Sequence, residues 1–391
     1  MPMAIISGAL ANKPFNGGNA WTRMSWVLGL KKLGFEVIFV EQIDSQDCVD
    51  GAGRVSGFEH SINLAYFMST LKRFGLEGQC SLICDQGSKI HGLALKELTK
   101  KAREAHLVFN ISGHLTHAQL QTPDACKIYF DDDPGFTQFW HAAGSTGSRL
   151  VGHDFYYTVG ANIGSPNCPI PTNGVTWRHA PPPVLLQHWP VHRKDSMDRF
   201  TTVGSWRGAY GPVQHNGKRY GLKVHEFRKF LGLPRRNGAK FEVALQIDPA
   251  DKEDRDALLA NGWSLVDPKT TCGTPEAFRD YIANSGAEFS AAQGIYVDTN
   301  SGWFSDRTIR YLASGKPALV QETGFSSHYP TGLGLMAFRD LEAALVGAEA
   351  IEHDYQGHCS AARKIAEEFF DSDKVITRMM SEIGLGVPGM N

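Results

Sequence analysis

Two clusters of polar residues in the first half of the chain could do acid–base chemistry. Asp131, Asp132 and Asp133 follow the β-rich run 127–130, and His114 lies just after another such run. Adjacent carboxylates repel one another, which raises the affinity of at least one of them for a proton. We therefore predict His114, Asp132 and Asp133 as candidate general bases. The alternative for this cluster is that one aspartate caps a helix and the others are solvated.

A second stretch, residues 294–325, could hold a phosphate group. Ser305 and Asp306 are residue types that begin helices, and an apolar helical pattern follows them. The start of a helix collects unpaired N–H groups and the positive pole of the helix dipole, so it attracts anions. Arg307 in the first turn is unfavourable for the dipole, and a phosphate partner would explain it. The alternative is an ordinary strand–helix–strand unit with a surface arginine.

Two further cations fall at comparable positions in the second half. Arg207 follows the expected strand 199–203, and Lys223 begins the expected helix 223–231. Together with Arg307 and backbone N–H groups, such cations suit a diphosphate leaving group whose charge must be stabilised without a metal. Any one of these cations could also be a solvated surface charge.

The first half opens with a strand, a glycine loop and a helix. The apolar run 4–6 leads to Asn16, Gly17 and Gly18, and an apolar helical pattern covers 21–33. The spacing of the glycines matches neither GxGxxG nor a phosphate-binding P-loop. We expect Gly17 and Gly18 to let the backbone pass close to a ligand or to the opposite domain, with a tight turn as the alternative.

Alternation of strands and helices continues through the whole chain and predicts an α/β fold with mostly parallel, doubly wound sheets. The expected strands are 4–6, 37–40, 81–84, 106–111, 127–130, 155–159, 199–203, 241–247, 263–266, 295–297 and 318–320. The expected helices are 21–33, 61–74, 91–104, 223–231, 251–260, 275–285, a helix from 305, 341–351, 360–370 and 373–383.

A proline-rich passage separates two halves of similar architecture. Residues 166–190 contain seven prolines and cannot form a helix. At 391 residues the chain is long for a single core. We therefore expect a first domain at 1–190, a second, ligand-binding domain at 191–370, and a terminal helix within 371–391 that packs back on the first domain.

Composition excludes several classes of protein. The net charge of −2 gives no support for binding nucleic acid or an anionic membrane. No run of about 18 apolar residues could span a bilayer, and the first residues lack the pattern of a signal peptide. Seven cysteines without a CxxC motif suit a reducing compartment. A cytoplasmic enzyme, either monomeric or homodimeric, is the expectation.

The second half resembles the nucleotide-sugar domain of GT-B glycosyltransferases. The segment SDRTIRYLASGKPALVQETGF follows their donor motif, and VGSWRG resembles the first strand and loop of that domain. The opening glycine loop and the two terminal helices are also similar. The resemblance implies two Rossmann-like domains that face each other across a cleft, with a nucleoside diphosphate sugar as co-substrate and no other cofactor. The other substrate would be a small-molecule or glycan acceptor.

The resemblance assigns site residues and also shows a departure. Retaining enzymes of the commonest type place glutamates near the positions of Trp303 and Arg310, so retaining and inverting chemistry both stay open. Asp306 or Glu322 is then expected to take the acidic task of ribose recognition. The expected donor residues are Arg207, Lys223, Ser301, Gly302, Ser305, Asp306, Arg307, Gln321, Glu322, Thr323 and Gly324. The expected acceptor side of the cleft is formed by Asn16, Gly17 and Gly18.

Three alternatives accompany this prediction. The acidic run 131–133 could bind a metal, as DxD motifs do in sugar transferases of the other major fold, but that fold has one nucleotide domain and this chain has two. We therefore expect a metal-independent transferase. An epimerase of nucleotide sugars on the same fold would need acid–base carboxylates and no acceptor pocket. A binding or scaffold protein would keep the fold without turnover.

Overall fold

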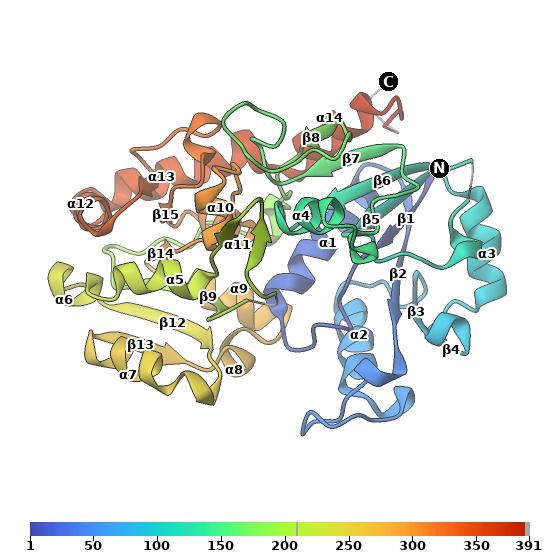
Figure 1. Cartoon of the computed structure of the whole chain (residues 1–391), viewed down its shortest axis with the longest axis horizontal. Coiled ribbons are helices and arrows are strands. Elements are labelled where there is room, and N and C mark those ends of the chain that lie inside the picture. Colours follow the sequence, from blue (N-terminus) through green and yellow to red (C-terminus); the bar gives the residue numbers. More distant parts are fainter. Residues whose placement is uncertain (123, 209, 388–391) are drawn as a thin grey trace.

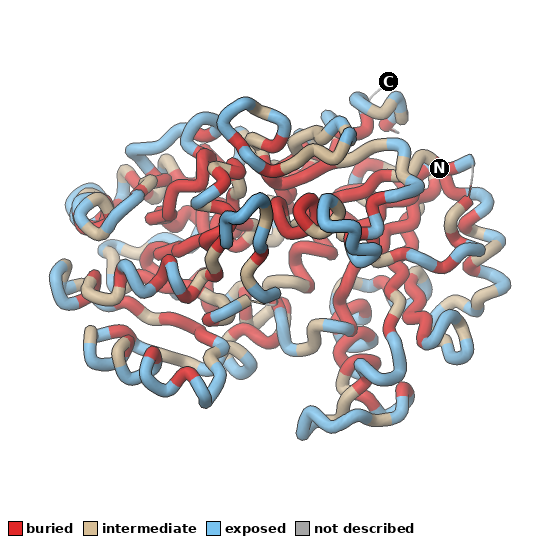
Figure 2. Tube along the Cα trace, in the orientation of Figure 1, coloured by how far each residue is buried: buried red, intermediate tan, exposed pale blue. Residues whose placement is uncertain are grey.

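The computed structural model describes residues 1–122, 124–208 and 210–387. Within them, two large sheets form, and their central strands are buried (Figures 1 and 2). Eight strands build the first sheet, in the order β4-β3-β2-β1-β5-β6-β7-β8, and six build the second, in the order β13-β12-β9-β14-β15-β16. Apart from β4, which runs antiparallel to β3, all pairs in both sheets are parallel. The prediction of two doubly wound parallel sheets is confirmed.

The first sheet uses the first 179 residues of the chain. Its strands are β1 (Met3–Ser7), β2 (Glu36–Ile43), β3 (Cys80–Cys84), β4 (Lys89–Gly92), β5 (Leu107–Ile111), β6 (Cys126–Asp131), β7 (Phe155–Thr158) and β8 (Trp177–His179). The helices that connect them are α1 (Gly17–Lys32), α2 (Ile62–Arg73), α3 (Leu95–Glu104) and α4 (Phe136–Ala142). The near-continuous apolar runs of β1, β3 and β5 are buried throughout, as parallel strands covered on both faces require.

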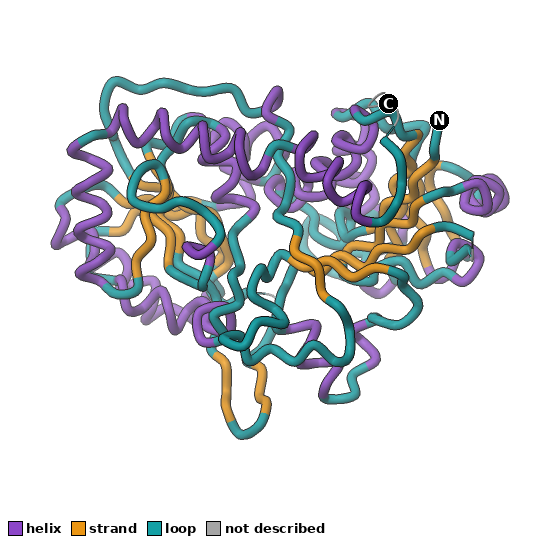
Figure 3. Tube along the Cα trace, turned by 90° about the horizontal axis from the view of Figure 1, so that it is seen from above, coloured by secondary structure: helices purple, strands orange, loops and turns teal. Residues whose placement is uncertain are grey.

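The second sheet begins at Phe200. Its strands are β9 (Phe200–Ser205), β12 (Phe241–Gln246), β13 (Trp263–Val266), β14 (Ala287–Ser290), β15 (Ala318–Gln321) and β16 (Leu335–Phe338). Its helices are α5 (Lys223–Phe227), α6 (Leu233–Asn237), α7 (Lys252–Ala260), α8 (Pro268–Cys272), α9 (Pro275–Ala283), α10 (Gly294–Asp298), α11 (Asp306–Ala313), α12 (Leu341–His353) and α13 (Tyr355–Ile365). A separate hairpin of β10 (Val213–His215) and β11 (Lys218–Tyr220) projects away from the two large sheets (Figure 3).

Two local predictions were wrong. The run 295–297 is not a strand but lies in helix α10, because β14 already pairs with both β9 and β15. His91 lies in strand β4 and not in the following helix, which begins at Leu95. The proline-rich passage also contributes a strand that was not predicted, β8. It lies at the edge of the sheet, where a segment rich in proline, which lacks a backbone N–H, can be accommodated. A short apolar run does not by itself distinguish a strand from a buried helix.

The end of the chain returns to the first domain. Helix α14 (Ser372–Glu382) packs against α1. The Ile376 side chain fills the space beside Gly29, and a Cβ atom at position 29 would overlap it. The hydroxyl of Tyr157 in β7 donates a hydrogen bond to Glu382 over 2.8 Å. In Figure 1 this red helix lies beside the green strands of the first sheet.

Close approach of the two domains depends on the glycines at the start of α1. A Cβ atom on Gly17 would overlap the carbonyl oxygen of Thr274, and one on Gly18 would lie 3.0 Å from the Phe278 ring. The Trp21 indole N–H also donates to the Pro275 carbonyl, over 2.8 Å. The glycine loop therefore passes close to the opposite domain, which is one of the two functions expected for it.

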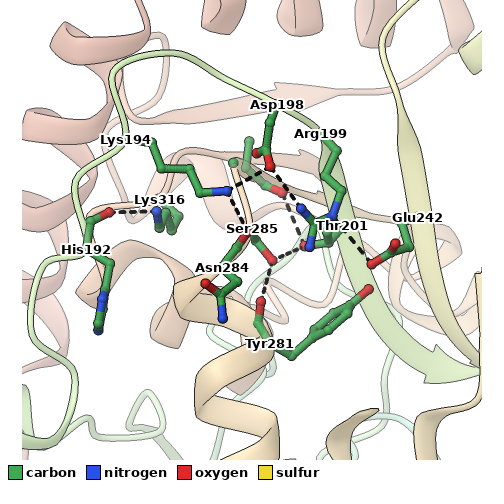
Figure 4. Close-up of polar contacts among 12 residues, drawn as sticks. His192, Lys194, Asp198, Arg199, Thr201, Glu242, Tyr281, Asn284, Ser285 and Lys316 are labelled. Carbon is green, nitrogen blue, oxygen red and sulfur yellow. Dashed lines mark hydrogen bonds and ion pairs between the residues drawn. The ribbon is translucent and has the colours of Figure 1, made fainter.

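A polar network at the amino-terminal edge of the second sheet holds residues 192–198, the segment that leads into β9, in place (Figure 4). The Lys316 ammonium donates to the His192 carbonyl over 2.6 Å, and the Lys194 ammonium bonds Asp198 over 2.7 Å. The Thr201 hydroxyl in β9 donates to Ser285 over 2.6 Å. These contacts lie at the opposite edge from the loops that follow the strands, so we assign them to structure and not to ligand binding.

Candidate functional site

The predicted site residues of the first domain lie in the loops after β5 and β6. These loops face the second domain, since the Tyr296 hydroxyl of α10 donates to the Asp133 carboxylate over 3.2 Å. Ligands of open parallel sheets bind at this carboxyl edge. We define the interdomain cluster as Lys13, Arg23, Glu41, His114, Asp132, Asp133, Lys223 and Asp306.

Asp132 is the best placed candidate for a base. Its carboxylate lies 3.1 Å from Nη2 of Arg23, and both side chains are largely buried. Burial raises the pKa of Asp132 to about 6, although the charge of Arg23 opposes the shift. At neutral pH the carboxylate is mostly ionised, yet its proton affinity is well above that of a solvated aspartate. Such a group can take a proton from a hydroxyl.

Asp131, in contrast, is a structural residue. Its carboxylate is fully buried and accepts hydrogen bonds from Thr137, Gln138 and Thr158 at 2.8–2.9 Å. These bonds join the end of β6 to α4 and β7 and leave no accessible oxygen. The three adjacent aspartates therefore differ: the Asp131 side chain lies in the core, whereas those of Asp132 and Asp133 lie between the domains.

His114 lies beside the same cations. Burial, and then the charges of Arg23 and Lys13, lower the pKa of His114 to about 3. The imidazole is therefore neutral at pH 7 and holds a proton poorly. It can orient a bound hydroxyl group by hydrogen bonding, whereas Asp132 is better suited to accept a proton.

A buried glutamate holds the loop that carries Lys13. Both carboxylate oxygens of Glu41, at the end of β2, accept backbone N–H groups: Ala11 donates over 2.6 Å and Asn12 over 2.9 Å. Burial raises the pKa of Glu41 to about 7. Burial also lowers the pKa of Lys13, with Arg23 adding to the effect. The loop thus presents a cation beside Asp132 and Asp133.

Lys223 is the cation that the second domain contributes to the interdomain cluster. Burial, and then the charge of Arg307, lower the pKa of Lys223 to about 7. Its ammonium lies 3.2 Å from the position that a Cβ atom on Gly204 would take, so a glycine at 204 leaves room for it. Within the described chain this ammonium forms no ion pair, so a bound anion would strongly stabilise its charged form.

Asp306 connects the domains at the start of α11. Its carboxylate accepts a hydrogen bond from the Thr22 hydroxyl of α1 over 2.5 Å and an ion pair from Arg310 at 3.1 Å. Arg310 is fully buried, and one of its terminal nitrogens reaches the Ser25 hydroxyl of α1 at 3.4 Å. The charge of Asp306 also acts on Asp132, so the two acidic groups belong to one electrostatic unit.

Arg307 is buried with its donors already engaged. Nε donates to Glu288 over 2.6 Å, Nη1 to the Val203 carbonyl over 2.8 Å, and Nη2 to the Ser290 hydroxyl over 2.7 Å. The guanidinium thus connects α11 to strands β9 and β14. Its role toward a phosphate stays a prediction, and its contacts in the structure are those of a core residue.

Arg207 and two predicted donor residues near the end of β15, Gln321 and Glu322, lie in local networks. The Arg207 guanidinium binds the Asp251 carboxylate and is half exposed. Gln321 accepts from the Ala292 N–H over 3.0 Å and donates to Glu226 over 2.6 Å, while Glu322 accepts from the Gly324 N–H over 2.6 Å. The structure therefore does not bring these side chains into the interdomain cluster.

The remaining predicted positions shape the backbone near α11. Ser305 caps the helix by accepting the Arg307 N–H over 3.3 Å, and the Ser301 hydroxyl accepts from the Trp303 N–H over 3.2 Å. The Gly302 N–H donates to the Thr323 carbonyl over 2.7 Å. Across the interface, the Asn16 side chain caps α1 by accepting from Asn19 over 3.0 Å.

Sequence reasoning missed Lys13, Arg23, Glu41 and Thr22. For Arg23 a signal existed, because it lies three residues after Ala20 and four before Val27, on an otherwise apolar helix face. A charge at such a position is buried and needs a partner. Lys13 and Glu41 gave no comparable signal, since their proximity depends on the pairing of β1 with β2.

Across residues 1–122, 124–208 and 210–387, His, Cys, Asp and Glu side chains form no group of three or more that could hold a metal ion. Nor does any helix in this part of the chain combine the length and apolar content that crossing a membrane requires.

No protein-family model and no curated protein matches the chain. Solved structures do resemble it over 98% of its length. An alpha-glucosyltransferase (AGT) in complex with UDP is 12% identical, with a TM-score of 0.61 over all of that chain. HepE of Anabaena, in complex with UDP and glucose, is 10% identical, with a TM-score of 0.56 over all of its chain. Sucrose-phosphate synthase of Thermosynechococcus elongatus is 13% identical, with a TM-score of 0.54 over 98% of its chain. The chain thus has the two-domain, Rossmann-like GT-B architecture of these glycosyltransferases.

Proposed function

We propose that the protein is a glycosyltransferase that moves a sugar from a nucleoside diphosphate sugar to a hydroxyl of an acceptor. One observation carries the proposal. Adjacent residues of α1 bind one carboxylate from each domain: the Thr22 hydroxyl donates to Asp306 over 2.5 Å, and Nη2 of Arg23 lies 3.1 Å from Asp132. Both carboxylates lie at the carboxyl edges of the two parallel sheets. A base in the first domain, a helix start in the second domain and cations from both are what transfer from a diphosphate needs.

The cations would hold the diphosphate. Lys223 and Lys13 approach the interdomain space from opposite domains, and α11 begins there with Asp306 in its first turn. As the bond to the sugar breaks, negative charge develops on the leaving diphosphate, and fixed ammonium groups and N–H dipoles would stabilise it. We propose that this charge compensation makes a metal unnecessary. The structural neighbours that hold UDP support a uridine diphosphate donor.

The acceptor would lie against the first domain. Asp132 would take the proton of the attacking hydroxyl, and neutral His114 would orient that hydroxyl by hydrogen bonding. Arg23 would keep Asp132 in place and largely ionised near neutral pH. Whether the anomeric configuration is inverted or retained is read directly from the product by NMR.

The decisive experiment is incubation with UDP-, GDP- and ADP-sugars, with and without a mixture of acceptors. We expect free nucleotide to be released only when an acceptor is present, at a rate that EDTA does not change. Asp132→Asn should abolish this release, and the exposed Arg255→Gln should not alter it. A new nucleotide sugar formed without nucleotide release would identify an epimerase instead. Binding without any turnover would identify a binding protein, and either result would overturn the proposal.

A further inference from the structure

A groove of about 630 Å³ runs along the first domain, outside the interdomain cluster. Its walls are the loop after β5, the first residues of β6 and the connection from α4 to β7. Gly113, which precedes His114 in the chain, forms part of its wall, and the charge of Arg149, another lining residue, acts on His114. A molecule whose hydroxyl group reached His114 and Asp132 could therefore extend into this groove.

The charge of the groove is one-sided. Lys127 and Arg149 line it, and none of its described lining residues is aspartate or glutamate. Neither cation forms an ion pair with a carboxylate elsewhere in the described parts of the chain. The Arg149 guanidinium has only a long contact of 3.4 Å with the Gly113 carbonyl. The nearby Asp154 carboxylate is engaged by the backbone N–H of Lys127 at 2.8 Å and does not line the groove.

The two histidines of the groove already form hydrogen bonds within the protein. Burial lowers the pKa of His153, whose Nδ1 lies 3.2 Å from the Leu150 carbonyl oxygen and whose Nε2 lies 3.1 Å from the Asn110 amide nitrogen. His141 contacts the Ser148 hydroxyl through Nδ1, at 3.0 Å. The permanent positive charges of the groove are those of Lys127 and Arg149.

Arg149 also has an unusual backbone. Its φ of 51° is left-handed, a conformation that costs energy in a residue other than glycine. The same conformation places its Cβ atom against Gly113, which itself has a φ of 67°. The fold thus maintains an arginine in the groove wall beside Gly113, at some cost in backbone energy.

We propose that this groove binds an anionic group, a phosphate or a carboxylate, of the acceptor. The inference rests on the proposed function, because it names the class of acceptor for the same reaction. An arginine fork and a lysine ammonium suit such a group, since both form charge-assisted hydrogen bonds with its oxygens. A neutral acceptor would leave both cations without a partner.

The test measures how fast phenylglyoxal modifies Arg149, by peptide mass spectrometry, with UDP present at saturation. Saturating UDP keeps added anions out of the donor site. Inorganic phosphate and acetate are the two probes, one for each source of negative charge. We expect at least one of them to slow the modification of Arg149 about three-fold or more. Arg255, an exposed arginine on α7, is the internal control and should react at an unchanged rate.

A variant keeps the result specific to the groove. Lys127→Gln should remove most of the protection of Arg149, whereas Lys240→Gln, the same charge change at an exposed position of the second domain, should preserve it. Equal modification of Arg149 with and without both anions would overturn the inference, as would full protection in Lys127→Gln. Failure of UDP to bind, measured by calorimetry, would instead count against the proposed function and leave the groove result interpretable.

Discussion

The Arg23 guanidinium lies 3.1 Å from the Asp132 carboxylate and joins helix α1 to the loop after β6. Both side chains are largely buried, and burying either charge without the other would cost folding free energy. Despite this pair, the pKa of Asp132 is raised to about 6, because burial outweighs the attraction of the cation. The pair therefore combines a fixed position with a proton affinity suited to a base that works near neutral pH.

Turnover should depend on the ionisation of Asp132. We expect kcat/KM to fall about ten-fold per pH unit as the pH drops below about 6, because the protonated carboxyl group cannot accept another proton. Arg23→Met removes the cation that favours the ionised form, so the acid limb should move to higher pH. A pH–rate profile of both proteins measures this. An unchanged acid limb in Arg23→Met would rule out Asp132 as the titrating group.

Binding of UDP should be coupled to proton uptake by Lys223. The pKa of this lysine is lowered to about 7, and a bound diphosphate would raise it by supplying opposite charge. At pH 8 the neutral amine must then gain a proton on binding, so UDP affinity should fall as the pH rises above 7. Calorimetry in two buffers of different ionisation enthalpy measures the protons taken up. Lys223→Met is the control, and equal uptake in this variant would contradict the assignment.

Loss of Arg307 should cost much more stability than loss of Arg207. Arg307→Met leaves Glu288, which is fully buried, without its cation, and breaking such a pair costs about 3–5 kcal/mol. The half-exposed Arg207 forms a surface pair with Asp251, which solvent screens, so its removal should have a much smaller effect on stability. Urea unfolding of the two variants compares them directly. Similar stabilities would show that the Arg307 contacts are not structural.

A side chain at position 17 should disturb the interface between the domains. The Cβ atom of Gly17→Ala would overlap the Thr274 carbonyl, and overpacking of this kind costs about 1–3 kcal/mol. Gly57→Ala is the matched control, since nothing lies within 4 Å of the added methyl group. Small-angle scattering should show a larger radius of gyration for Gly17→Ala alone. Identical scattering from both variants would contradict this packing argument.

Local sequence signals predicted the parts of the fold that depend on neighbouring residues. Ser305 and Asp306 at the start of α11 are one example, because a helix cap uses groups two or three residues away. The parallel arrangement followed equally well from the alternation of strands and helices. The run 295–297 was assigned wrongly, because its partners lie in the first domain: Ile295 and Tyr296 pack with Phe136.

The interdomain cluster was predicted only in part. His114, Asp132 and Lys223 were found because each follows or begins an element at the carboxyl edge. Their partners Lys13 and Glu41 could not be found, since three-dimensional proximity and not spacing brings them together. The engagement of Arg307 with Glu288 was hidden for the same reason, as the two lie on different elements 19 residues apart.

The chain crosses between the domains twice, once before β9 and once at the start of α14, and the two crossings are joined. Val184 donates its N–H to the Phe370 carbonyl over 2.8 Å and accepts from the Ser372 N–H over 3.0 Å. Two connecting segments that are hydrogen-bonded side by side prevent the domains from sliding past each other or separating. They still allow one domain to rotate about the line along which the segments meet. This line would act as a hinge. Opening for substrate would then be a single rotation, in which Gly17 leaves Thr274, Thr22 leaves Asp306 and the ion pair of Arg23 with Asp132 moves with the first domain as a rigid unit.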